Sequence, residues 1–131
     1  MGIVSCLGND LDTVSSALAA GRSGIRAMPD YPAAGLRSHV AGVPQIVVSE
    51  HIDRRDLRFM GDAAAFAAIS MARAIAQSGL TETEISNPRT GLIAGTGGGS
   101  PANIVEVADT LRARGLRKVG ATRVPRTMCS T

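Results

Sequence analysis

Apolar residues recur with a helical period near the start of the chain. Three of them share one face of a helix between about residues 10 and 20, namely Leu11, Val14 and Leu18. Asn9 or Asp10 precedes this face and can accept hydrogen bonds from the first N–H groups of the helix. Gly21 follows it and supplies a helix stop. The pattern therefore predicts a helix that ends at about Ala20.

The segment between residues 21 and 49 shows no helical pattern. Residues 21–38 are rich in glycine, proline and arginine, which predicts a loop. From Ser38 to Ser49 the chain carries β-branched residues with a break at Pro44, which predicts short extended segments. These β-branched residues are Val40, Val43, Ile46, Val47 and Val48.

The clearest helical pattern runs from Ala63 to Gln77, directly after Asp62. Its apolar residues surround nearly the whole helix, which predicts burial on several sides. They are Ala63, Ala64, Phe66, Ala67, Ile69, Met71, Ala72 and Ile75. Gly79 ends this helix, and the Thr-Glu-Thr-Glu sequence at residues 81–84 has the spacing of a capping box for a short helical turn.

A short apolar run, a glycine-rich turn and a third helical pattern follow one another. Gly91–Ala94 predicts a buried strand, and residues 95–100 predict the turn after it. The helical stripe consists of Ile104, Val107, Ala108 and Leu111. Arg112 and Arg114 stand at its end, where cations complement the helix dipole. Helices that alternate with short buried strands predict an α/β fold without an internal boundary over residues 1–131.

Length and composition narrow the class of protein. A chain of 131 residues is one domain or part of one, long enough for a hydrophobic core. No apolar run approaches the roughly 18 residues that span a bilayer, and no signal-peptide pattern follows Met1. Cys6 and Cys129 match no metal-binding spacing. We therefore expect a reduced, cytoplasmic protein that binds no membrane and no metal.

Charge is distributed unevenly along the chain, although the net charge is only +3. Residues 1–111 carry eight basic and eleven acidic residues, whereas residues 112–131 carry six basic residues and no acidic one. A second, smaller basic cluster contains Arg54, Arg55 and Arg58. Thirteen of the fourteen basic residues are arginine, which binds carboxylate or phosphate through two hydrogen bonds. An anionic partner is one interpretation, and a solvated basic face is the other.

The glycine-rich turn resembles nucleotide-binding motifs only in part. Residues 95–100 read G-x-G-x-x-S, so the third glycine of the dinucleotide motif is missing. Glu106 and Asp109 follow too soon for the ribose contact, which is expected about 20 residues further on. The G-K-[ST] of a P-loop is also missing. A turn at which the backbone passes close to another backbone or a ligand is the alternative.

Cys129 is the one candidate nucleophile that the charge pattern offers. Arg123 and Arg126 precede it and could lower a thiol pKa. No histidine follows His51, so a Cys–His pair would require tertiary contact. His39 and His51 are isolated in the sequence and are interpreted as surface or hydrogen-bonded histidines.

A series of short motifs covers essentially the whole chain. In order, they are Gly2-Ile3-Val4-Ser5, Gly21-Arg22-Ser23-Gly24-Ile25, Arg37-Ser38-His39-Val40, Asp53-Arg54-Arg55, Arg58-Phe59-Met60, Gly91–Pro101, Arg114-Gly115-Leu116 and Thr127-Met128. In this combination they resemble the N-terminal part of the β-ketoacyl-[acyl-carrier-protein] synthases of the elongating, type I kind. Gly97-Gly98-Gly99 favours type I, because type II relatives usually carry a bulky aliphatic residue in this turn.

The resemblance implies a thiolase-like fold, in which two similar α/β halves stack into five layers and the protein forms a homodimer. It implies a decarboxylative Claisen condensation of acyl- and malonyl-carrier protein in fatty-acid elongation. That reaction uses a cysteine thiolate, two histidines, an oxyanion hole and a lysine. The resemblance implies no cofactor of the enzyme's own, because the phosphopantetheine arm arrives on the acyl carrier protein.

The same resemblance places every catalytic group beyond residue 131. Cys129 matches a small residue of the family and is not the nucleophile. We therefore expect an incomplete N-terminal half, without the first strand and the catalytic-cysteine region, that has no catalytic residue and performs no condensation by itself. A sheet that lacks neighbouring strands is also expected to leave backbone groups and apolar faces unpaired.

Two sets of residues take a role from the resemblance. Basic residues at the positions of Arg54, Arg55, Arg58, Arg114 and Arg117 face the acidic carrier protein in the family. The glycine-rich turn, Gly97, Gly98, Gly99 and Ser100, would line the acyl pocket. The first set coincides with the two basic clusters found from charge alone.

Two further interpretations stay open from the sequence. The chain could be a non-catalytic module that binds carrier protein and folds alone. It could also be a small nucleic-acid binder that uses its basic C-terminal segment. The near absence of aromatic residues and the acidic balance of residues 1–111 argue against nucleic acid.

Overall fold

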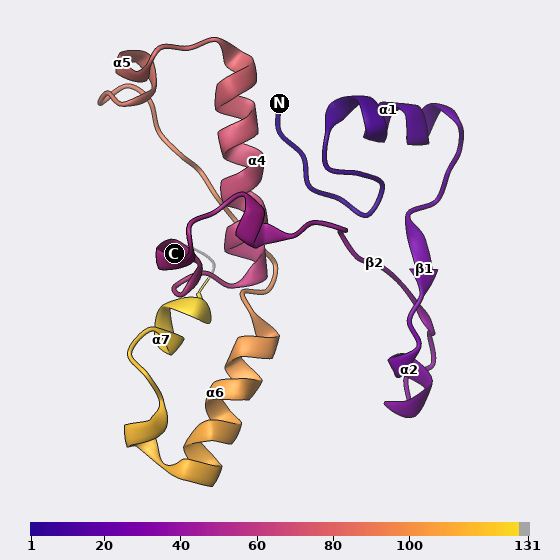
Figure 1. Ribbon diagram of the computed structural model, residues 1–131, viewed down its shortest axis with the longest axis vertical. Helices are drawn as coiled ribbons and strands as arrows, with labels where there is room; N and C mark the ends of the chain where they lie inside the picture. Colours follow the sequence, from indigo (N-terminus) through magenta and orange to yellow (C-terminus); the bar gives the residue numbers. More distant parts are fainter. Residues whose placement is uncertain (129–131) are drawn as a thin grey trace.

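The computed structural model describes residues 1–128, so Cys129 lies outside the described part of the chain. Figure 1 shows the order of the elements along the chain. The helices are α1 (Leu11–Ala19), α2 (Asp30–Ala33), α3 (Arg54–Leu57), α4 (Asp62–Ser78), α5 (Glu82–Ile85), α6 (Pro101–Arg114) and α7 (Arg123–Arg126). The strands are β1 (Ile25–Ala27) and β2 (Val40–Gly42), and two 3-10 turns are η1 (Val48–Glu50) and η2 (Leu116–Lys118).

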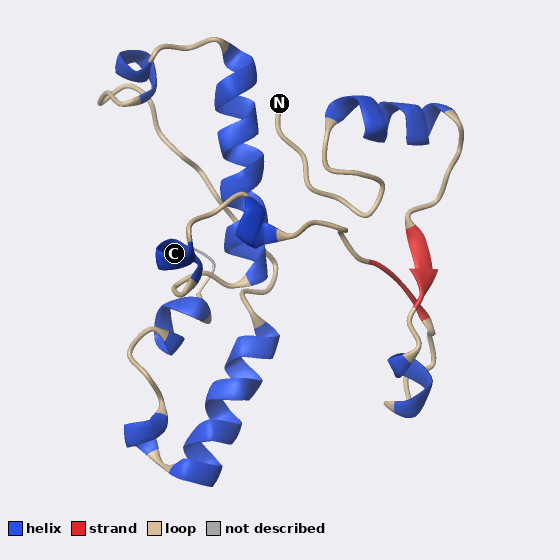
Figure 2. Cartoon of the chain, viewed as in Figure 1, coloured by secondary structure: helices blue, strands red, loops and turns tan. Residues whose placement is uncertain are grey.

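The elements form two arms that meet near the lower half of α4. One arm contains α6, η2 and α7, and the other contains β1, β2 and α2 below α1 (Figure 1). Figure 2 shows that the strands of the described residues lie only in the second arm. The fully apolar interior is small and is formed by Val14, Ala17, Ala64, Ala65 and Ile69.

Helix α1 confirms the helix predicted from the first apolar pattern. Asp10 is its N-cap, because the Asp10 carboxylate accepts a 2.8 Å hydrogen bond from the backbone N–H of Thr13. The helix ends before Gly21, whose φ of 62° lies in the left-handed region that favours glycine. Val14 and Ala17 are its buried residues, so the helix packs through one narrow face.

The loop predicted for residues 21–38 is only partly correct, because this segment contains β1 and the short helix α2. Strands β1 and β2 pair antiparallel, with Ile25 opposite Gly42 and Ala27 opposite Val40. Gly24 and Gly42 allow Cys6 to approach this hairpin closely. A Cβ on Gly24, for example, would lie 2.4 Å from the Cys6 carbonyl oxygen. The hairpin thus depends on contacts that a local sequence pattern does not reveal.

The segment predicted to be extended between residues 38 and 49 forms a paired strand only at β2. Ile46 and Val47 belong to neither strand nor helix, and Val48–Glu50 forms the turn η1. These residues have no neighbouring strand to pair with in the described part of the chain. Val47 nevertheless has an extended backbone, with φ −93° and ψ 95°, so the β-branched run indicates extended chain here but not a paired strand.

Helix α4 confirms the strongest helical prediction, and Gly79, with a φ of 70°, ends it as expected. The predicted burial on several sides is wrong within this chain. Only Ala64, Ala65 and Ile69 are buried, and Met71 on the same helix is 38% exposed. The described residues cover one side of α4 and leave apolar side chains on the other sides in contact with solvent.

The N-terminal segment, residues 1–9, lies along α4 and joins the two arms. The backbone at Gly2 approaches so closely that a Cβ there would lie 1.7 Å from the Ser70 carbonyl oxygen. Arg73 of α4 donates hydrogen bonds to the carbonyl oxygens of Ile3 and Asn9. The N-terminal amino group donates to the side chain of Gln77. Gly2 is therefore a contact position, which its place in a short motif alone did not explain.

The buried strand predicted for Gly91–Ala94 is absent. These residues belong to neither strand nor helix, and the side chains of Leu92 and Ile93 are 67% and 99% exposed. A strand needs a neighbour for its N–H and C=O groups, and the two strands of the described residues lie in the other arm. The expected unpaired apolar surface is therefore confirmed at this segment.

The remaining helical predictions are confirmed. Helix α5 begins with a complete capping box between Thr81 and Glu84. Helix α6 begins at Pro101, a favourable first helical position, and carries Arg112 and Arg114 in its last turn.

Candidate functional site

The first basic cluster surrounds helix α3. Arg54, Arg55 and Arg58 are exposed, and together with Leu57 they line an open depression of the surface. The guanidinium of Arg58 lies 4.7 Å from the centre of the Phe59 ring, a cation–π contact that restrains the Arg58 side chain. We call these three arginines the α3 cluster.

The second basic cluster lies at the far end of α6 and in η2. We call it the α6 cluster; its residues are Arg112, Arg114, Arg117 and Lys118, all exposed. Arg112 pairs with Asp109 one turn earlier at 3.2 Å, and both side chains are largely exposed. Among residues 1–128, no carboxylate forms an ion pair with Arg114 or Arg117. Their charge is therefore available to a partner.

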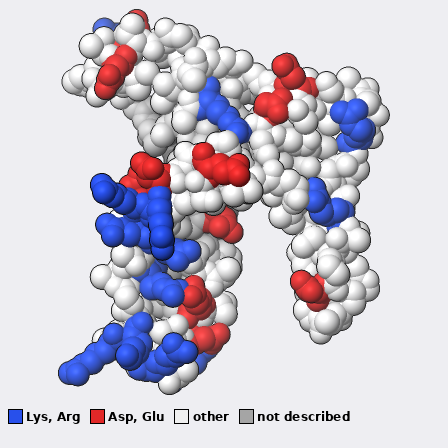
Figure 3. Space-filling view, viewed as in Figure 1, with Lys and Arg blue, Asp and Glu red and all other residues white. Residues whose placement is uncertain are grey.

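The two clusters lie along the same edge of the molecule. Figure 3 shows basic side chains gathered down the side of the first arm, with a few acidic side chains next to them. The arginines of both clusters come from segments about 60 residues apart in the sequence, from Arg54 to Arg114. The two clusters thus lie on the same side of the first arm, and the common role that the resemblance predicts for their five arginines stays a prediction.

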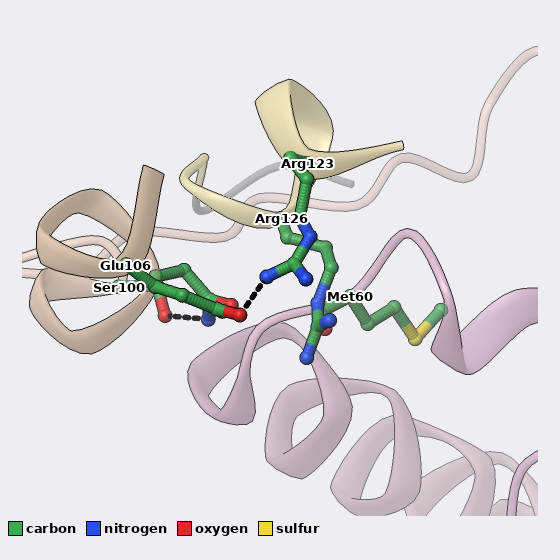
Figure 4. Close-up of polar contacts among 6 residues, drawn as sticks. Met60, Ser100, Glu106, Arg123 and Arg126 are labelled. Atoms are coloured by element: carbon green, nitrogen blue, oxygen red, sulfur yellow. Dashed lines mark hydrogen bonds and ion pairs between the residues drawn. The ribbon is translucent and has the colours of Figure 1, made fainter. Parts of the chain in front are cut away.

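Contacts join α6 and α7 to each other and to the segment that precedes α4 (Figure 4). Glu106 of α6 forms an ion pair with Arg123 of α7. Arg126, one turn later, donates a 3.3 Å hydrogen bond from Nε to the carbonyl oxygen of Met60. The sequence alone did not place Glu106, Arg123 or Arg126 at this junction, because the partner of each is distant in the chain.

Gly61 completes this junction by its lack of a side chain. A Cβ on Gly61 would lie 2.8 Å from both the Arg126 carbonyl oxygen and Ser100 Oγ. Ser100 is buried, with 6% of its surface exposed, and its Oγ accepts a 2.5 Å hydrogen bond from Asn103. Ser100 therefore packs inside the junction.

The glycine-rich turn is open in the described structure. No other atom lies within 4 Å of where a Cβ on Gly97 or Gly98 would be. Thr96 holds the turn, because its hydroxyl donates to the Gly98 carbonyl oxygen and accepts from the Gly98 N–H. The assignment of Gly97, Gly98, Gly99 and Ser100 to an acyl pocket stays a prediction.

The described residues form no metal-binding cluster and no membrane-spanning helix. Within residues 1–128, no three His, Cys, Asp or Glu side chains come together as metal ligands. Cys6 is half-buried as a free thiol beside the β1–β2 hairpin. None of the helices in this part of the chain has the length and apolarity needed to cross a membrane.

Three carboxyl groups have a pKa below the ordinary range. Hydrogen bonds from the Thr13 backbone and hydroxyl lower the pKa of Asp10. Hydrogen bonds from the Thr81 hydroxyl and backbone lower the pKa of Glu84. The hydrogen bond from Arg123 lowers the pKa of Glu106. Each hydrogen bond stabilises the ionised carboxylate, and this stabilisation is lost when the carboxylate takes up a proton.

These shifts predict that acid destabilises the chain. The unfolded chain titrates near the ordinary values of about 3.9 for Asp and 4.3 for Glu, so it binds protons at a higher pH than the folded chain. The stabilisation is complete above about pH 5 and decreases as the pH falls through the lowered pKa values. Urea unfolding followed by circular dichroism from pH 6 to pH 3 measures this. Glu84→Gln should reduce the pH dependence, and an unfolding midpoint that rises on acidification would contradict the prediction.

Comparison with known proteins relates the chain to enzymes of one kind. It matches the family described as "Beta-ketoacyl synthase, N-terminal domain" over residues 1–130. It is 47% identical over 131 residues to "3-oxoacyl-[acyl-carrier-protein] synthase 1" of Haemophilus influenzae. It is 46% identical over 132 residues to the protein of the same name from Escherichia coli strain K12. Each match covers 99% of this chain and 32% of the relative.

A solved structure is similar as well. The crystal structure of a β-ketoacyl synthase from Burkholderia phymatum matches with a TM-score of 0.71 and 26% sequence identity. The match covers 97% of this chain and 32% of the solved one. The chain thus spans about a third of the length of the relatives that it matches.

Proposed function

Because this chain belongs to the β-ketoacyl synthase family, we propose that it supplies the N-terminal, carrier-docking part of a 3-oxoacyl-[acyl-carrier-protein] synthase. Its matches confirm the thiolase-like α/β fold expected from the sequence motifs. The complete reaction of that class is a decarboxylative Claisen condensation, which lengthens a fatty-acyl chain. The relatives are named for their dependence on an acyl carrier protein.

The observation that carries this proposal is the alignment of two exposed arginine clusters on one edge (Figure 3). Arg54, Arg55 and Arg58 form one side of the docking surface, and Arg114 and Arg117 form the other. Arginine binds carboxylates through two parallel hydrogen bonds, which suits an acidic helix on the carrier protein. Exposed charges of this kind direct association and orientation, and salt weakens them.

Condensation itself is assigned to residues outside the described chain. The cysteine, the two histidines and the lysine of the reaction have no counterparts in the motifs that this chain shares with the family. The chain alone is therefore expected to bind carrier protein without lengthening its acyl group. Homodimer formation and a cytoplasmic location stay predictions.

The acyl-pocket assignment leads to a prediction for chain length. In a complete synthase that carries this N-terminal sequence, Gly98→Ile should shift the preference toward shorter acyl chains by about tenfold or more, because the added side chain fills space that the glycine leaves open. Competition between short and long acyl-carrier substrates measures this ratio. Gly91→Ala is the matched control, since it adds a side chain outside the turn. An unaltered ratio in Gly98→Ile would show that the turn does not line the acyl pocket.

The docking proposal is tested by an amide NMR titration of isotope-labelled acyl carrier protein with this chain at low and moderate salt. We expect shifts confined to the acidic helix of the carrier and weakened by salt. Duplex DNA of similar charge is added in competition. Absence of shifts with a folded chain, or preferential binding of DNA, would overturn the proposal.

A further inference from the structure

The contacts between the two clusters form a continuous connection. Arg126 is hydrogen-bonded to Met60, Arg123 is paired with Glu106, and both arginines belong to the short helix α7. We call these two contacts the α7 tie. Helix α7 therefore contacts the segment that follows α3 and also the middle of α6 (Figure 4).

The Met60 end of the tie fixes the α3 cluster. Met60 follows Arg58 by two residues, and the backbone between them is turned, with the Met60 N–H donating to the Leu57 carbonyl oxygen at 3.2 Å. Gly61 next to it is packed against Arg126 and Ser100. A displacement of Met60 would therefore displace the α3 cluster with it.

The Glu106 end of the tie fixes the α6 cluster. Glu106 and Arg114 lie in the same continuous helix, two turns apart, so they move as one body. The 3-10 turn η2 follows directly and carries Arg117 and Lys118. The Glu106–Arg123 ion pair thus fixes the orientation of α6 relative to α7. Because Arg126 of α7 is bonded to Met60, α6 is also oriented relative to α3.

We propose that Glu106 and Arg126 are positioning residues, which hold the α3 and α6 clusters in one fixed arrangement so that an acidic protein partner engages both at once. This inference rests on the proposed docking function and adds how that surface is organised. Two clusters that are held at a fixed separation bind one partner more tightly than two clusters that move independently, because less conformational freedom is lost when both contacts form.

The direction in which the affinity changes when Glu106 loses its charge distinguishes a positioning role from a purely electrostatic one. Removal of the Glu106 carboxylate makes the edge more positive, so electrostatics alone predicts tighter binding of an acidic partner. Loss of a fixed arrangement predicts weaker binding. Asp109 offers a matched control, because it is an acid on the same helix whose partner, Arg112, lies within that helix.

The experiment measures the affinity of the full chain for acyl carrier protein by the same NMR titration. Glu106→Gln should weaken binding by roughly two- to fivefold, the size expected for loss of one exposed ion pair. Arg126→Lys keeps the charge, removes the Nε donor and should weaken binding to a similar extent. Asp109→Asn should leave binding unchanged or make it tighter. The salt dependence of binding should become shallower in the first two variants, because fewer charges engage together.

A charge exchange completes the test. Glu106→Arg combined with Arg123→Glu keeps the net charge, restores an ion pair in the opposite direction and should bind like the unmodified chain. Circular dichroism confirms that each variant is folded before its affinity is compared. Tighter binding by Glu106→Gln, or equal weakening by Asp109→Asn, would overturn the positioning role while docking stands. Failure of the unmodified chain to bind carrier would overturn docking itself.

Discussion

Gly2→Val is expected to destabilise the chain by about 3 kcal/mol, the upper range for forcing a larger side chain into a closely packed contact. A Cβ at this position would lie 1.7 Å from the Ser70 carbonyl oxygen and 3.0 Å from the Ala74 N. These are backbone atoms of α4, which cannot rotate away as a side chain can. The N-terminal segment would have to leave the helix, and with it the hydrogen bonds from Arg73 to Ile3 and Asn9.

The measurement is urea unfolding of the variant and the unmodified chain under the same conditions. Gly91→Ala is the control, because Gly91 has no atom near its Cβ position. It should change the free energy of unfolding by no more than about 0.5 kcal/mol, as exposed substitutions usually do. Equal stability of Gly2→Val and the unmodified chain would show that residues 1–9 do not pack on α4 as described.

The second large effect concerns binding. Simultaneous charge reversal of Arg54, Arg58 and Arg114 to glutamate should weaken the affinity for acyl carrier protein by about tenfold to hundredfold, given up to about 1 kcal/mol for each exposed charge. All three side chains are exposed, so the substitutions leave the buried residues untouched. The loss should be largest at low salt, where the attraction between exposed charges is least screened.

A control with the same change of net charge distinguishes a docking surface from general attraction. Arg22, Arg26 and Arg89 are also exposed and lie outside the two clusters. Their reversal to glutamate should weaken binding by less than about threefold, because long-range attraction between exposed charges is screened beyond about 10 Å. Equal losses in the two triple variants, measured by NMR titration, would contradict docking at the α3 and α6 clusters.

The helices of this chain were predictable because their signals are local. Asp10 caps α1, Gly79 ends α4, and Thr81 with Glu84 forms a capping box, each within a few residues of the helix that it serves. The strands were not predictable in the same way. Leu92 and Ile93 have the apolar character of a buried strand, but a strand also needs a partner, which the described residues do not provide.

The candidate site was likewise predictable only where its signal is local in the sequence. The α3 and α6 clusters were visible as runs of arginine, since charge density can be counted along a sequence. The α7 tie was not visible. Glu106 and Arg123 are 17 positions apart, and Arg126 and Met60 are 66 positions apart, so only the folded chain pairs them. The close contacts of Gly2 and Gly61 were not visible either, because a glycine at a close approach carries no sign of its neighbour.

Residues 91–98 lie between α5 and α6, so they separate the α3 cluster from the α6 cluster along the chain. Their side chains are exposed, and proteases cleave accessible chain of this kind readily. One cut there would place Arg54 and Arg58 on one polypeptide and Arg114 on another. The docking face would then be an assembly of two pieces held by the hydrogen bond from Arg126 to Met60 and the contact of Ser100 with Gly61. Its affinity for a partner would depend on protein concentration, because dilution would separate the pieces.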